Sequence, residues 1–399
     1  MNNTVLISED LYYIGASDFR LALFENVYPV KNGASYNSYL LKDEKTVLFD
    51  TVDHAVEERF FENLVSALGG RKLDYLVVHH VEPDHSSCIQ RVIREFADVK
   101  VVTSQKAALM LSAYFGFDEK QATIVKAGDT LSTGKHTLRF FAAPMVHWPE
   151  VLMSFDEYSG TLFTADAFGS FGAIEGDLFA KWQQFERDML DEARRYYFNI
   201  VGKYGVQVQN ALKGVRDLPI RTVCPLHGQI WKEEFGYFLE KYDLWSSYAP
   251  EERGVVIFCG SVYGHTLNAA EILATALAGK GVPVKVYDTS KTEISYLLAE
   301  AFRYSHVVFA AATYNAGIFV NVERLIADLK AHNFQNRKYS LIESGSWAPQ
   351  SGKLMEAELS ALKNMQKVGE TVSMLASVKA ETVEKINALA EAIAKEFSH

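Results

Sequence analysis

Residues 79–85 read HHVEPDH and directly follow an apolar run that is typical of a buried strand. His80, Glu82 and Asp84 stand two residues apart, so an extended segment would project all three side chains to one side. His85 then begins the turn into a helix. Carboxylate and imidazole groups do not crowd together unless a cation, hydrogen bonds or solvent offsets their repulsion and desolvation. The stretch therefore favours a metal site at the end of a strand.

Three isolated residues further along the chain are also candidate ligands, because each borders a short apolar run. They are His147 in PMVHWP, Asp166 in FTAD and His227 in CPLHG, and strand ends are where α/β folds gather functional groups. Each has a simpler interpretation. A lone histidine after a strand is usually a loop or capping residue, and an aspartate there is often a helix cap. Taken one at a time, these residues leave both interpretations open.

The alternation of apolar runs with helical periodicity defines the fold class. The first part of the chain predicts mixed α/β layers, with apolar runs at 46–50, 76–78 and 138–141 and helical patterns at 55–68, 86–96 and 106–115. The last part predicts a doubly wound parallel sheet, with strands at 254–259, 282–287, 306–311, 338–342 and 371–375 and helices at 268–278 and 381–397. A polar segment with a proline lies between them, so we expect domains at 1–249 and 250–399.

A phosphate-binding loop is indicated between the first strand and the first helix of the second domain. Residues 259–266 read CGSVYGHT, and their small and hydroxyl side chains would let backbone N–H groups surround a phosphate at the helix N-terminus. The loop lacks both the Lys-Ser/Thr pair of a nucleotide-triphosphate loop and the Gly-x-Gly-x-x-Gly dinucleotide fingerprint. Two later segments, 313–317 and 344–347, follow the third and fourth strands at the edge where such sheets bind ligands.

Composition excludes several classes of function. The 399 residues include 40 Lys or Arg and 50 Asp or Glu, and a net charge of −10 argues against a general nucleic-acid-binding surface. No apolar run is long enough to span a bilayer, and no secretion signal is recognisable, so we expect no membrane association. Cys88, Cys224 and Cys259 have neither metal-ligand nor redox spacing, which favours a reducing, cytoplasmic location.

Together, the strand, the HHVEPDH loop and the distant His, Asp and His resemble the metallo-β-lactamase superfamily. Within it, His-x-Glu-x-Asp-His is similar to the diiron signature of the flavodiiron proteins, whereas the zinc hydrolases usually carry a histidine where this chain has Glu82. The intervals between the ligand positions also match the flavodiiron pattern. The resemblance implies two non-haem iron ions, one held by His80, Glu82 and His147, the other by Asp84, His85 and His227, with Asp166 bridging them.

The chemistry of this ligand set agrees with the resemblance, because four imidazoles and three carboxylates without a thiolate suit iron that cycles between ferrous and ferric states. Zinc hydrolysis needs only a Lewis acid and a bound water. In some relatives the first histidine turns away from the metal, so ligation by His80 in every state is left open. We expect Trp148 and the Tyr196-Tyr197 pair to line the pocket beside the irons, with Tyr197 favoured of the two tyrosines. The alternative for Tyr197 is that it only packs its helix onto the core.

The second domain resembles flavodoxin, with a phosphate loop of the Ser-x-Tyr-Gly-x-Thr kind and two loops that flank an isoalloxazine ring. The resemblance implies an FMN site. We expect phosphate contacts from Ser261, Tyr263, Gly264, His265 and Thr266, and contacts to the ring from Thr313, Tyr314, Asn315, Ala316, Gly317, Ser346 and Trp347. A tryptophan in a Gly/Ser-rich loop is poorly placed for core packing, so we expect Trp347 to stack on the flat ligand.

The resemblance covers essentially the whole chain. It implies a metallo-β-lactamase-like αββα sandwich followed by a flavodoxin-like doubly wound five-stranded parallel sheet. FMN would relay electrons from a separate carrier such as rubredoxin to two irons that reduce dioxygen to water, or nitric oxide to nitrous oxide. The resemblance also implies a head-to-tail homodimer that brings one chain's FMN beside the other chain's irons. The ligand set itself does not separate the two gases.

Two other functions fit part of the pattern. A zinc-dependent hydrolase fused to a flavodoxin module is disfavoured by Glu82, and it would be favoured by two zinc ions per chain without iron. An electron carrier whose first domain is an inactive scaffold is disfavoured because all seven ligand positions are occupied.

Overall fold

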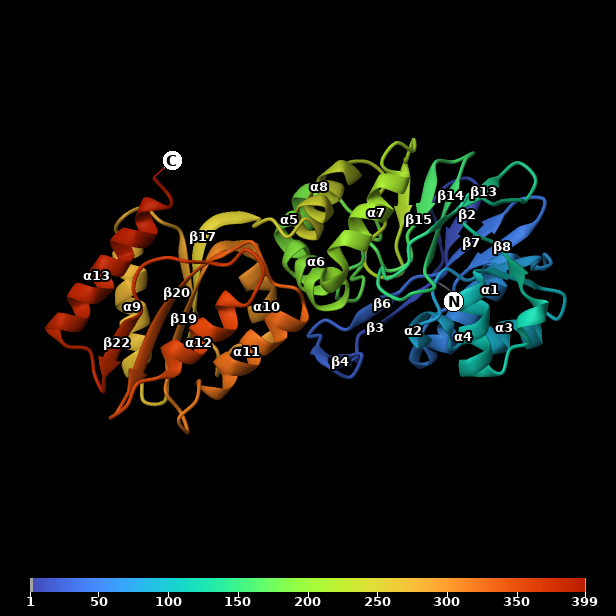
Figure 1. Cartoon of the computed structure of the whole chain (residues 1–399). Coiled ribbons are helices and arrows are strands. Elements are labelled where there is room, and N and C mark those ends of the chain that lie inside the picture. The colour runs from blue at the N-terminus through green and yellow to red at the C-terminus, as the bar shows by residue number, and fades with distance from the viewer. Residues whose placement is uncertain (1–2, 399) are drawn as a thin grey trace. The chain divides into compact units, whose positions relative to one another are not determined.

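The computed structural model describes residues 3–398, and the chain divides into two compact units, Met1–Asp243 and Leu244–His399 (Figure 1). Each unit has its own sheets and its own buried core. Among the described residues, no helix is both long enough and apolar enough to cross a membrane.

Two sheets packed face to face form the centre of the first unit. The larger sheet has the order β1-β2-β7-β8-β9-β10-β11, with bounds Val5–Leu6, Leu11–Tyr13, Tyr39–Lys42, Thr46–Phe49, Tyr75–Val77, Lys100–Thr103 and Thr123–Ile124. The second sheet has the order β12 to β16, with bounds Thr130–Ser132, Thr137–Ala142, Leu152–Asp156, Thr161–Phe163 and Thr222–Cys224. The core lies between them, where the ring of Phe49 stacks on that of Phe163 with centroids 3.9 Å apart.

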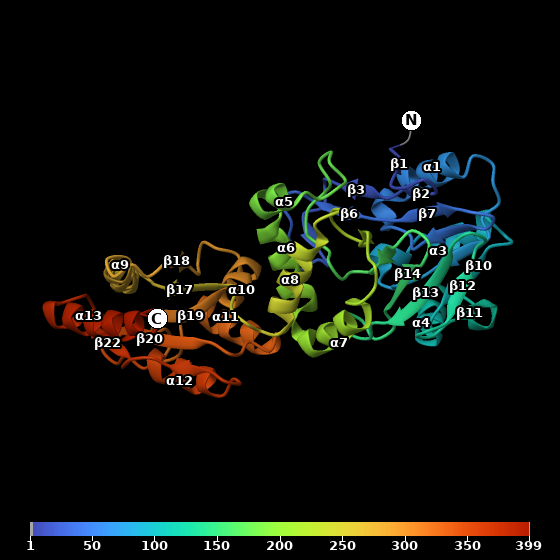
Figure 2. The same cartoon turned by 90° about the horizontal axis from the view of Figure 1, so that it is seen from above.

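Helices lie outside this pair of sheets, so the first unit is the expected αββα sandwich (Figures 1 and 2). The helices are α1 to α4, with bounds Glu57–Leu68, Pro83–Ser86, Ile89–Glu95 and Gln105–Phe115, and α5 to α8, with bounds Trp182–Asp188, Leu190–Tyr196, Gly205–Val215 and Phe235–Ser246. A π-helical segment, Tyr197–Val201, follows α6. Two small hairpins complete the unit: β3 (Ala16–Asp18) with β6 (Ala34–Tyr36), and β4 (Leu23–Phe24) with β5 (Tyr28–Pro29).

Local chemistry accounts for several of these boundaries. The helix α4 begins after Ser104, whose hydroxyl accepts a hydrogen bond from the backbone N–H of Ala107 at 3.1 Å. It ends at Gly116, which adopts a left-handed conformation that glycine tolerates without strain. The predicted helical patterns at 55–68 and 106–115 are therefore confirmed to within a turn.

The second unit is a doubly wound parallel sheet. Its order is β18-β17-β19-β20, and β21 and β22 both pair with β20. The strands are β17 to β22, with bounds Glu252–Gly260, Val284–Asp288, Tyr304–Ala312, Lys338–Gly345, Gln366–Lys367 and Val372–Leu375. The helices are α9 to α13, with bounds His265–Ala278, Ile294–Arg303, Val320–Ala331, Ser351–Ser360 and Ala380–Lys395. All five predicted strands are confirmed, and the last is preceded by the short extra strand β21.

The strand order of this sheet decides where a ligand binds. Helices α9 and α13 pack on one face, and α10 to α12 cover the other (Figure 1). The order reverses between β17 and β19, whose chain connections leave in opposite directions. A crevice at the carboxyl ends of such strands is the usual ligand site of an open α/β sheet. The segments 259–266, 313–317 and 344–347 all lie at this edge.

Candidate metal centre and cofactor site

The HHVEPDH stretch is not a continuous extended segment, and in this respect the sequence prediction was wrong. Pro83 is the first residue of α2, where its fixed φ and missing N–H cost nothing. His80 and Glu82 therefore lie on the loop after β9, whereas Asp84 and His85 lie in the first turn of a helix. The change from loop to helix turns the second pair of side chains away from the first. It thereby divides one short stretch between two neighbouring groups of ligands.

The first group consists of His80, Glu82, His147 and Asp166, whose nearest polar atoms all lie within 4.8 Å of one another. The Nε2 atom of His147 is 3.0 Å from the Oε2 atom of Glu82 and 3.1 Å from the Oδ2 atom of Asp166. The Nε2 atom of His80 is 3.2 Å from the same Glu82 oxygen and 3.6 Å from the same Asp166 oxygen. The Nε2 atoms of His80 and His147 therefore both face one oxygen of Glu82 and one oxygen of Asp166.

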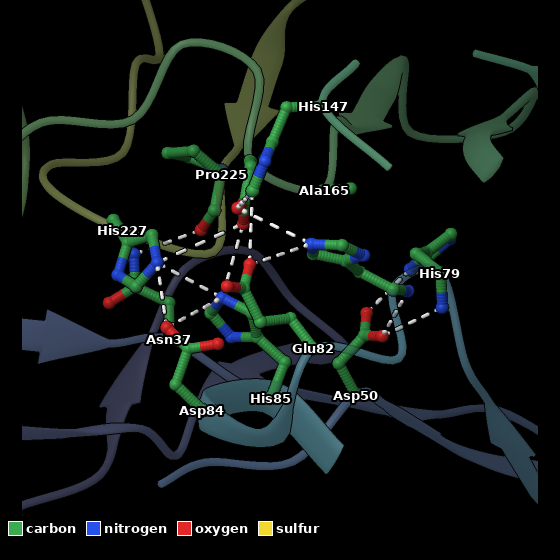
Figure 3. Close-up of polar contacts among 12 residues, drawn as sticks. Asn37, Asp50, His79, Glu82, Asp84, His85, His147, Ala165, Pro225 and His227 are labelled. Atoms are coloured by element: carbon green, nitrogen blue, oxygen red, sulfur yellow. Dashed lines mark hydrogen bonds and ion pairs between the residues drawn. The ribbon is translucent and has the colours of Figure 1, made fainter. Parts of the chain in front are cut away.

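The second group consists of Asp84, His85 and His227. The Nε2 atoms of the two histidines are 3.0 Å apart, and each lies within 3.4 Å of the Oδ2 atom of Asp84. Two ring nitrogens this close must share a proton or a cation, because two lone pairs facing each other repel. Figure 3 shows the rings of His85 and His227 side by side, next to the carboxylate of Asp84.

Asp166 connects the two groups. Its Oδ2 atom faces His80 and His147, whereas its Oδ1 atom lies 3.1 Å from the Nε2 atom of His85 and 3.8 Å from that of His227. Asp166 is 1% exposed, so water does not stabilise its charge. One carboxylate with an oxygen directed into each group is the arrangement of a bridging ligand.

Buried hydrogen bonds hold the loops that carry these side chains. The side-chain amide of Asn37 donates to the carbonyl oxygens of Pro225 and Gly228, both at 2.9 Å, and so fixes the loop after β16 (Figure 3). The ring of His227 donates from Nδ1 to the carbonyl oxygen of Ser35 at 2.7 Å, which leaves Nε2 directed at the cluster. Nothing in the local sequence around Asn37 indicates this role, because its partners lie almost 190 residues away.

His79 does not join either group. Its Nδ1 atom lies 2.6 Å from the Oδ2 atom of Asp50 and its Nε2 atom lies 2.8 Å from the hydroxyl of Ser154. The other oxygen of Asp50 accepts from the backbone N–H groups of His79 and His80. This network therefore anchors the start of the loop, and the His79 ring faces away from the ligands.

The pKa values of the cluster reflect mutual attraction that outweighs burial. Burial alone would lower the pKa of His147, but hydrogen bonds with Asp166 and Glu82 raise it to about 9. Burial would likewise lower the pKa of His227, which Asp84 and Asp166 raise to about 9. Conversely, burial would raise the pKa of Asp166, and the neighbouring histidines hold it well below its usual range. Asp166 therefore stays anionic in a buried space, which favours a cation there.

Aromatic residues surround the two groups. The ring of Trp148 lies 5.4 Å from that of His80 and perpendicular to it, which places Trp148 beside the cluster as expected from the sequence. Tyr196 rather than Tyr197 is the tyrosine against the ligands: its ring centroid is 5.6 Å from that of His227. The ring of Tyr197 instead packs edge-on against Tyr242. In a helix, neighbouring residues point about 100° apart, so a shift of one residue changes which ring faces the site.

A pocket of about 460 Å³ leads to the cluster from the surface. Its lining includes the ligand candidates Glu82 and Asp84, one from each group, and the β4–β5 hairpin with Phe24 and Glu25 at its turn. Phe24 is buried, with its ring centroid 5.2 Å from that of His227. A small molecule that enters this pocket therefore meets both groups at once. No pattern in the sequence indicates that this hairpin forms part of the site.

The loop after β17 has the features of a phosphate site. Gly264 adopts a left-handed conformation with φ of 88° immediately before α9, and its N–H donates to the hydroxyl of Ser261 at 3.0 Å. The buried hydroxyl of Thr266 lies 2.8 Å from that of Ser344, which connects this loop to the end of β20. Tyr263 is 89% exposed. The backbone N–H groups at the start of α9 are available to an anion.

The two later loops flank the same edge of the sheet. Asn315 and Ala316 both have positive φ in a tight turn closed by hydrogen bonds between Tyr314 and Gly317. The hydroxyl of Thr313 accepts from the backbone of Gln350 and Ser351 and fixes the neighbouring loop. Ser346 and Trp347 lie on that loop, and Trp347 is 87% exposed. Exposed aromatic rings at a ligand-binding edge are suited to stacking on a flat molecule.

Comparisons with known proteins agree with both sites. Residues 34–228 match the ODP family beta lactamase, and residues 257–374 match flavodoxin. The chain is 30% identical over 325 residues to an uncharacterized protein of Methanocaldococcus jannaschii, with 80% of each chain covered. It is 29% identical to a nitric oxide reductase of Moorella thermoacetica, with 91% of each covered. The structure superposes on rubredoxin oxygen:oxidoreductase of Desulfovibrio gigas with a TM-score of 0.92 and 26% identity, over 99% of this chain and 98% of that one.

The fold and the comparisons together define a two-domain protein in which a metallo-β-lactamase-like domain is followed by a flavodoxin-like domain. This arrangement along the whole chain is that of the superposed oxygen:oxidoreductase. The chain belongs to the flavodiiron proteins.

Proposed function

We propose that the seven clustered side chains hold two iron ions, one in each group, with Asp166 bridging them. The observation that carries this proposal is the division of the ligands into two groups that share one carboxylate. The residues fit such a pair of ions. The Oδ1 atom of Asp166 faces the second group and is buried without a hydrogen-bond partner among residues 3–398, and the buried charge of Asp166 needs positive charge beside it.

FMN fits the second site on the chemistry of its loops. The hydroxyls of Ser261 and Thr266 and the N-terminus of α9 would hold the phosphate. Trp347 and Tyr314, both exposed at the edge of the sheet, would lie against the isoalloxazine ring. When bound, FMN and two irons together supply four electrons. Four electrons and four protons convert dioxygen to two waters, whereas two electrons and two protons convert two nitric oxide molecules to nitrous oxide and water.

The chain is an oxidoreductase of dioxygen, nitric oxide or both. The pocket beside Phe24 is large enough to admit a molecule of this size to both groups. The carboxylates of Glu82 and Asp84, one in each group, would hold the two irons and offset their positive charge. The hydroxyl of Tyr196 lies buried next to the ligands, where it can donate a hydrogen bond or a proton to the bound gas.

The electron donor in this proposal is a rubredoxin or a similar small carrier. The superposed protein of Desulfovibrio gigas is named a rubredoxin oxygen:oxidoreductase, which supports this donor.

We further propose a head-to-tail homodimer, in which the FMN of one chain reduces the irons of its partner. The cytoplasmic location also remains a prediction from the sparse cysteines.

Substitution of one ligand separates this function from its alternatives. Asp84→Asn removes a charged oxygen ligand from the second group without a change in volume, and we expect it to abolish gas reduction while FMN stays bound. The measurements are iron and FMN content, together with dioxygen and nitric oxide consumption by the anaerobically reduced protein. Unchanged turnover in the variant would contradict the metal assignment. Two zinc ions and no iron in the wild-type protein would favour a hydrolase.

A further inference from the structure

Glu150 is a buried carboxylate that is not in either ligand group. It is 2% exposed and lies on the connection between β13 and β14, three residues after the candidate ligand His147. Its Oε1 atom accepts a hydrogen bond from the backbone N–H of Val81 at 3.0 Å and lies 2.8 Å from the Nδ1 atom of His80. Both contacts involve Oε1, and Oε2 is buried without a hydrogen-bond partner among residues 3–398, so these two contacts alone offset the desolvation of the carboxyl group.

The contact with His80 fixes the orientation of the ring. An unprotonated carboxyl oxygen only accepts hydrogen bonds, as Oε1 does from Val81, so in its contact with Oε1 the Nδ1 atom of His80 is the donor. The lone pair is then on Nε2, which faces Glu82 at 3.2 Å and Asp166 at 3.6 Å. The bond from Val81 to the same oxygen holds the carboxylate in place relative to the loop that carries His80. The ring therefore has one preferred tautomer and one preferred direction.

Two other histidines of the cluster, His227 and His85, are held differently. His227 donates to a neutral backbone carbonyl, that of Ser35. The Nδ1 atom of His85 has no hydrogen-bond partner among residues 3–398. A carboxylate makes the imidazole that it contacts a stronger electron donor than a carbonyl does, because it stabilises positive charge on the ring. Of these three rings, His80 is therefore the one whose hydrogen-bond partner most increases its strength as an electron donor.

We propose that Glu150 is a positioning residue that commits His80 to the metal and increases its donor strength towards the oxidised ion. The inference rests on the proposed function, because it requires a metal in the first group. It answers a question that the ligand motif alone leaves open, namely whether the first histidine of the motif turns towards the metal in this chain. The answer depends on a residue 70 positions away, and no feature of the HHVEPDH stretch reveals it.

Two substitutions separate the two parts of this role. Glu150→Leu removes the acceptor and leaves the Nδ1–H of His80 and the N–H of Val81 unpaired. We expect the affinity for one of the two irons to fall by roughly 10- to 100-fold, which is the range for lost outer hydrogen bonds to a metal ligand. Glu150→Gln keeps an acceptor oxygen but removes the charge. We expect this variant to retain two irons and to have a higher diiron reduction potential, because its oxidised form is less stabilised.

Ser154→Ala is the matched control. It breaks the hydrogen bond to the adjacent histidine, His79, which is also buried and also bonded to a carboxylate but faces away from the ligands. We expect iron affinity and reduction potential to stay at their wild-type values in this control. FMN content and far-ultraviolet circular dichroism of all variants report whether the chain has folded.

The measurements are anaerobic titration of bound ferrous iron with a competing chelator and potentiometric titration of the diiron centre. Selective loss of one iron in Glu150→Leu, with a raised potential in Glu150→Gln, supports the inference. Equal affinity for both irons in Glu150→Leu and an unchanged potential in Glu150→Gln would overturn it, as would equal weakening of both sites. A wild-type protein that binds no iron would instead refute the proposed function on which the inference depends.

Discussion

Tyr196 is the last residue of α6 and lies beside the ligand groups, and Tyr197 follows it in the chain. The two tyrosines are adjacent at the end of α6, and only the structure shows that the ring of Tyr196 packs against His227. Burial raises the pKa of Tyr196 well above its ordinary value, with smaller contributions from Asp166 and other nearby acidic groups. The hydroxyl therefore stays protonated at neutral pH and remains a donor.

We expect Tyr196→Phe to lower kcat for gas reduction by roughly 100-fold, which is the usual cost of removing one placed donor from an active site. Iron content should not change, because the ring remains and the hydroxyl is not a ligand. Steady-state gas consumption at saturating donor, with iron analysis of the same samples, measures both quantities.

Tyr197→Phe is the matched comparison one residue along. Its ring packs on Tyr242 rather than on a ligand, so we expect a much smaller effect on kcat. A loss of turnover in Tyr197→Phe with normal turnover in Tyr196→Phe would show that the sequence prediction was right and that our assignment from the structure is wrong.

At the scale of single residues, the ligands were predictable from the sequence, whereas the residues that hold those ligands in place were not. The HHVEPDH stretch is dense enough to indicate a metal site, and the seven predicted side chains do converge. Asn37 and Glu150 were missed because their roles depend on contacts across 70 to 190 residues of sequence. Local spacing carries no information on such contacts.

At the scale of the elements, β19 contains a histidine that makes the flavodoxin-like unit sensitive to acid. His306 is 1% exposed and its Nε2 atom lies 3.0 Å from the hydroxyl of Ser340 on β20. Burial, with a smaller contribution from Lys338, lowers the pKa of His306 to about 3. In the unfolded chain its pKa would be near the ordinary value of about 6.5.

The sign of the effect follows from where the proton binds. Between pH 6.5 and pH 3 the unfolded chain takes up a proton at His306 and the folded chain does not. The stabilising contribution is therefore complete above pH 6.5 and is lost as pH falls towards 3. We expect His306→Gln to lose less stability than the wild-type protein between pH 7 and pH 5, by up to about 1.4 kcal/mol per pH unit.

The difference in stability between the two proteins is measured by urea unfolding of this unit, monitored by the fluorescence of FMN as it is released. Between pH 7 and pH 9 the two proteins should show parallel dependences on pH, which provides the internal control. Parallel curves between pH 7 and pH 5 as well would mean that His306 is protonated in the folded unit, contrary to its burial.

Strands were easier to predict than the short helix at the metal site. The five parallel strands of the second unit are buried on both faces, so each gives a continuous apolar run. The four-residue helix α2 has no room for helical periodicity, and its only signal is Pro83 at its first position. The division of the ligands into two groups follows from this helix, and the alternation argument therefore failed there.

At the scale of the whole molecule, the proposed dimer predicts that two inactive chains can complement each other. Asp84→Asn inactivates the metal site, and Ser261→Asp places a negative charge where the FMN phosphate would bind. If electrons pass between chains of a head-to-tail dimer, a co-expressed equal mixture should regain about a quarter of wild-type turnover. Half of the dimers would be mixed, and each would contain one intact pair of sites.

Separately purified variants, assayed alone, are the controls and should both be inactive. Absence of recovery in co-expressed, dimeric protein with the expected FMN content would show that electrons do not cross between chains. Recovery much above a quarter would also be inconsistent with one working pair of sites per mixed dimer.

The most direct test of the account is the reaction of the fully reduced protein with gas. Protein that contains iron and FMN is reduced anaerobically with reduced rubredoxin and mixed with dioxygen or with nitric oxide, and kcat/KM is measured for each. The account predicts sustained turnover with at least one gas, with water or nitrous oxide as the product, and the ratio of the two values identifies the preferred substrate. Turnover with neither gas, in protein that holds two irons and FMN per chain and accepts electrons from the donor, would contradict it.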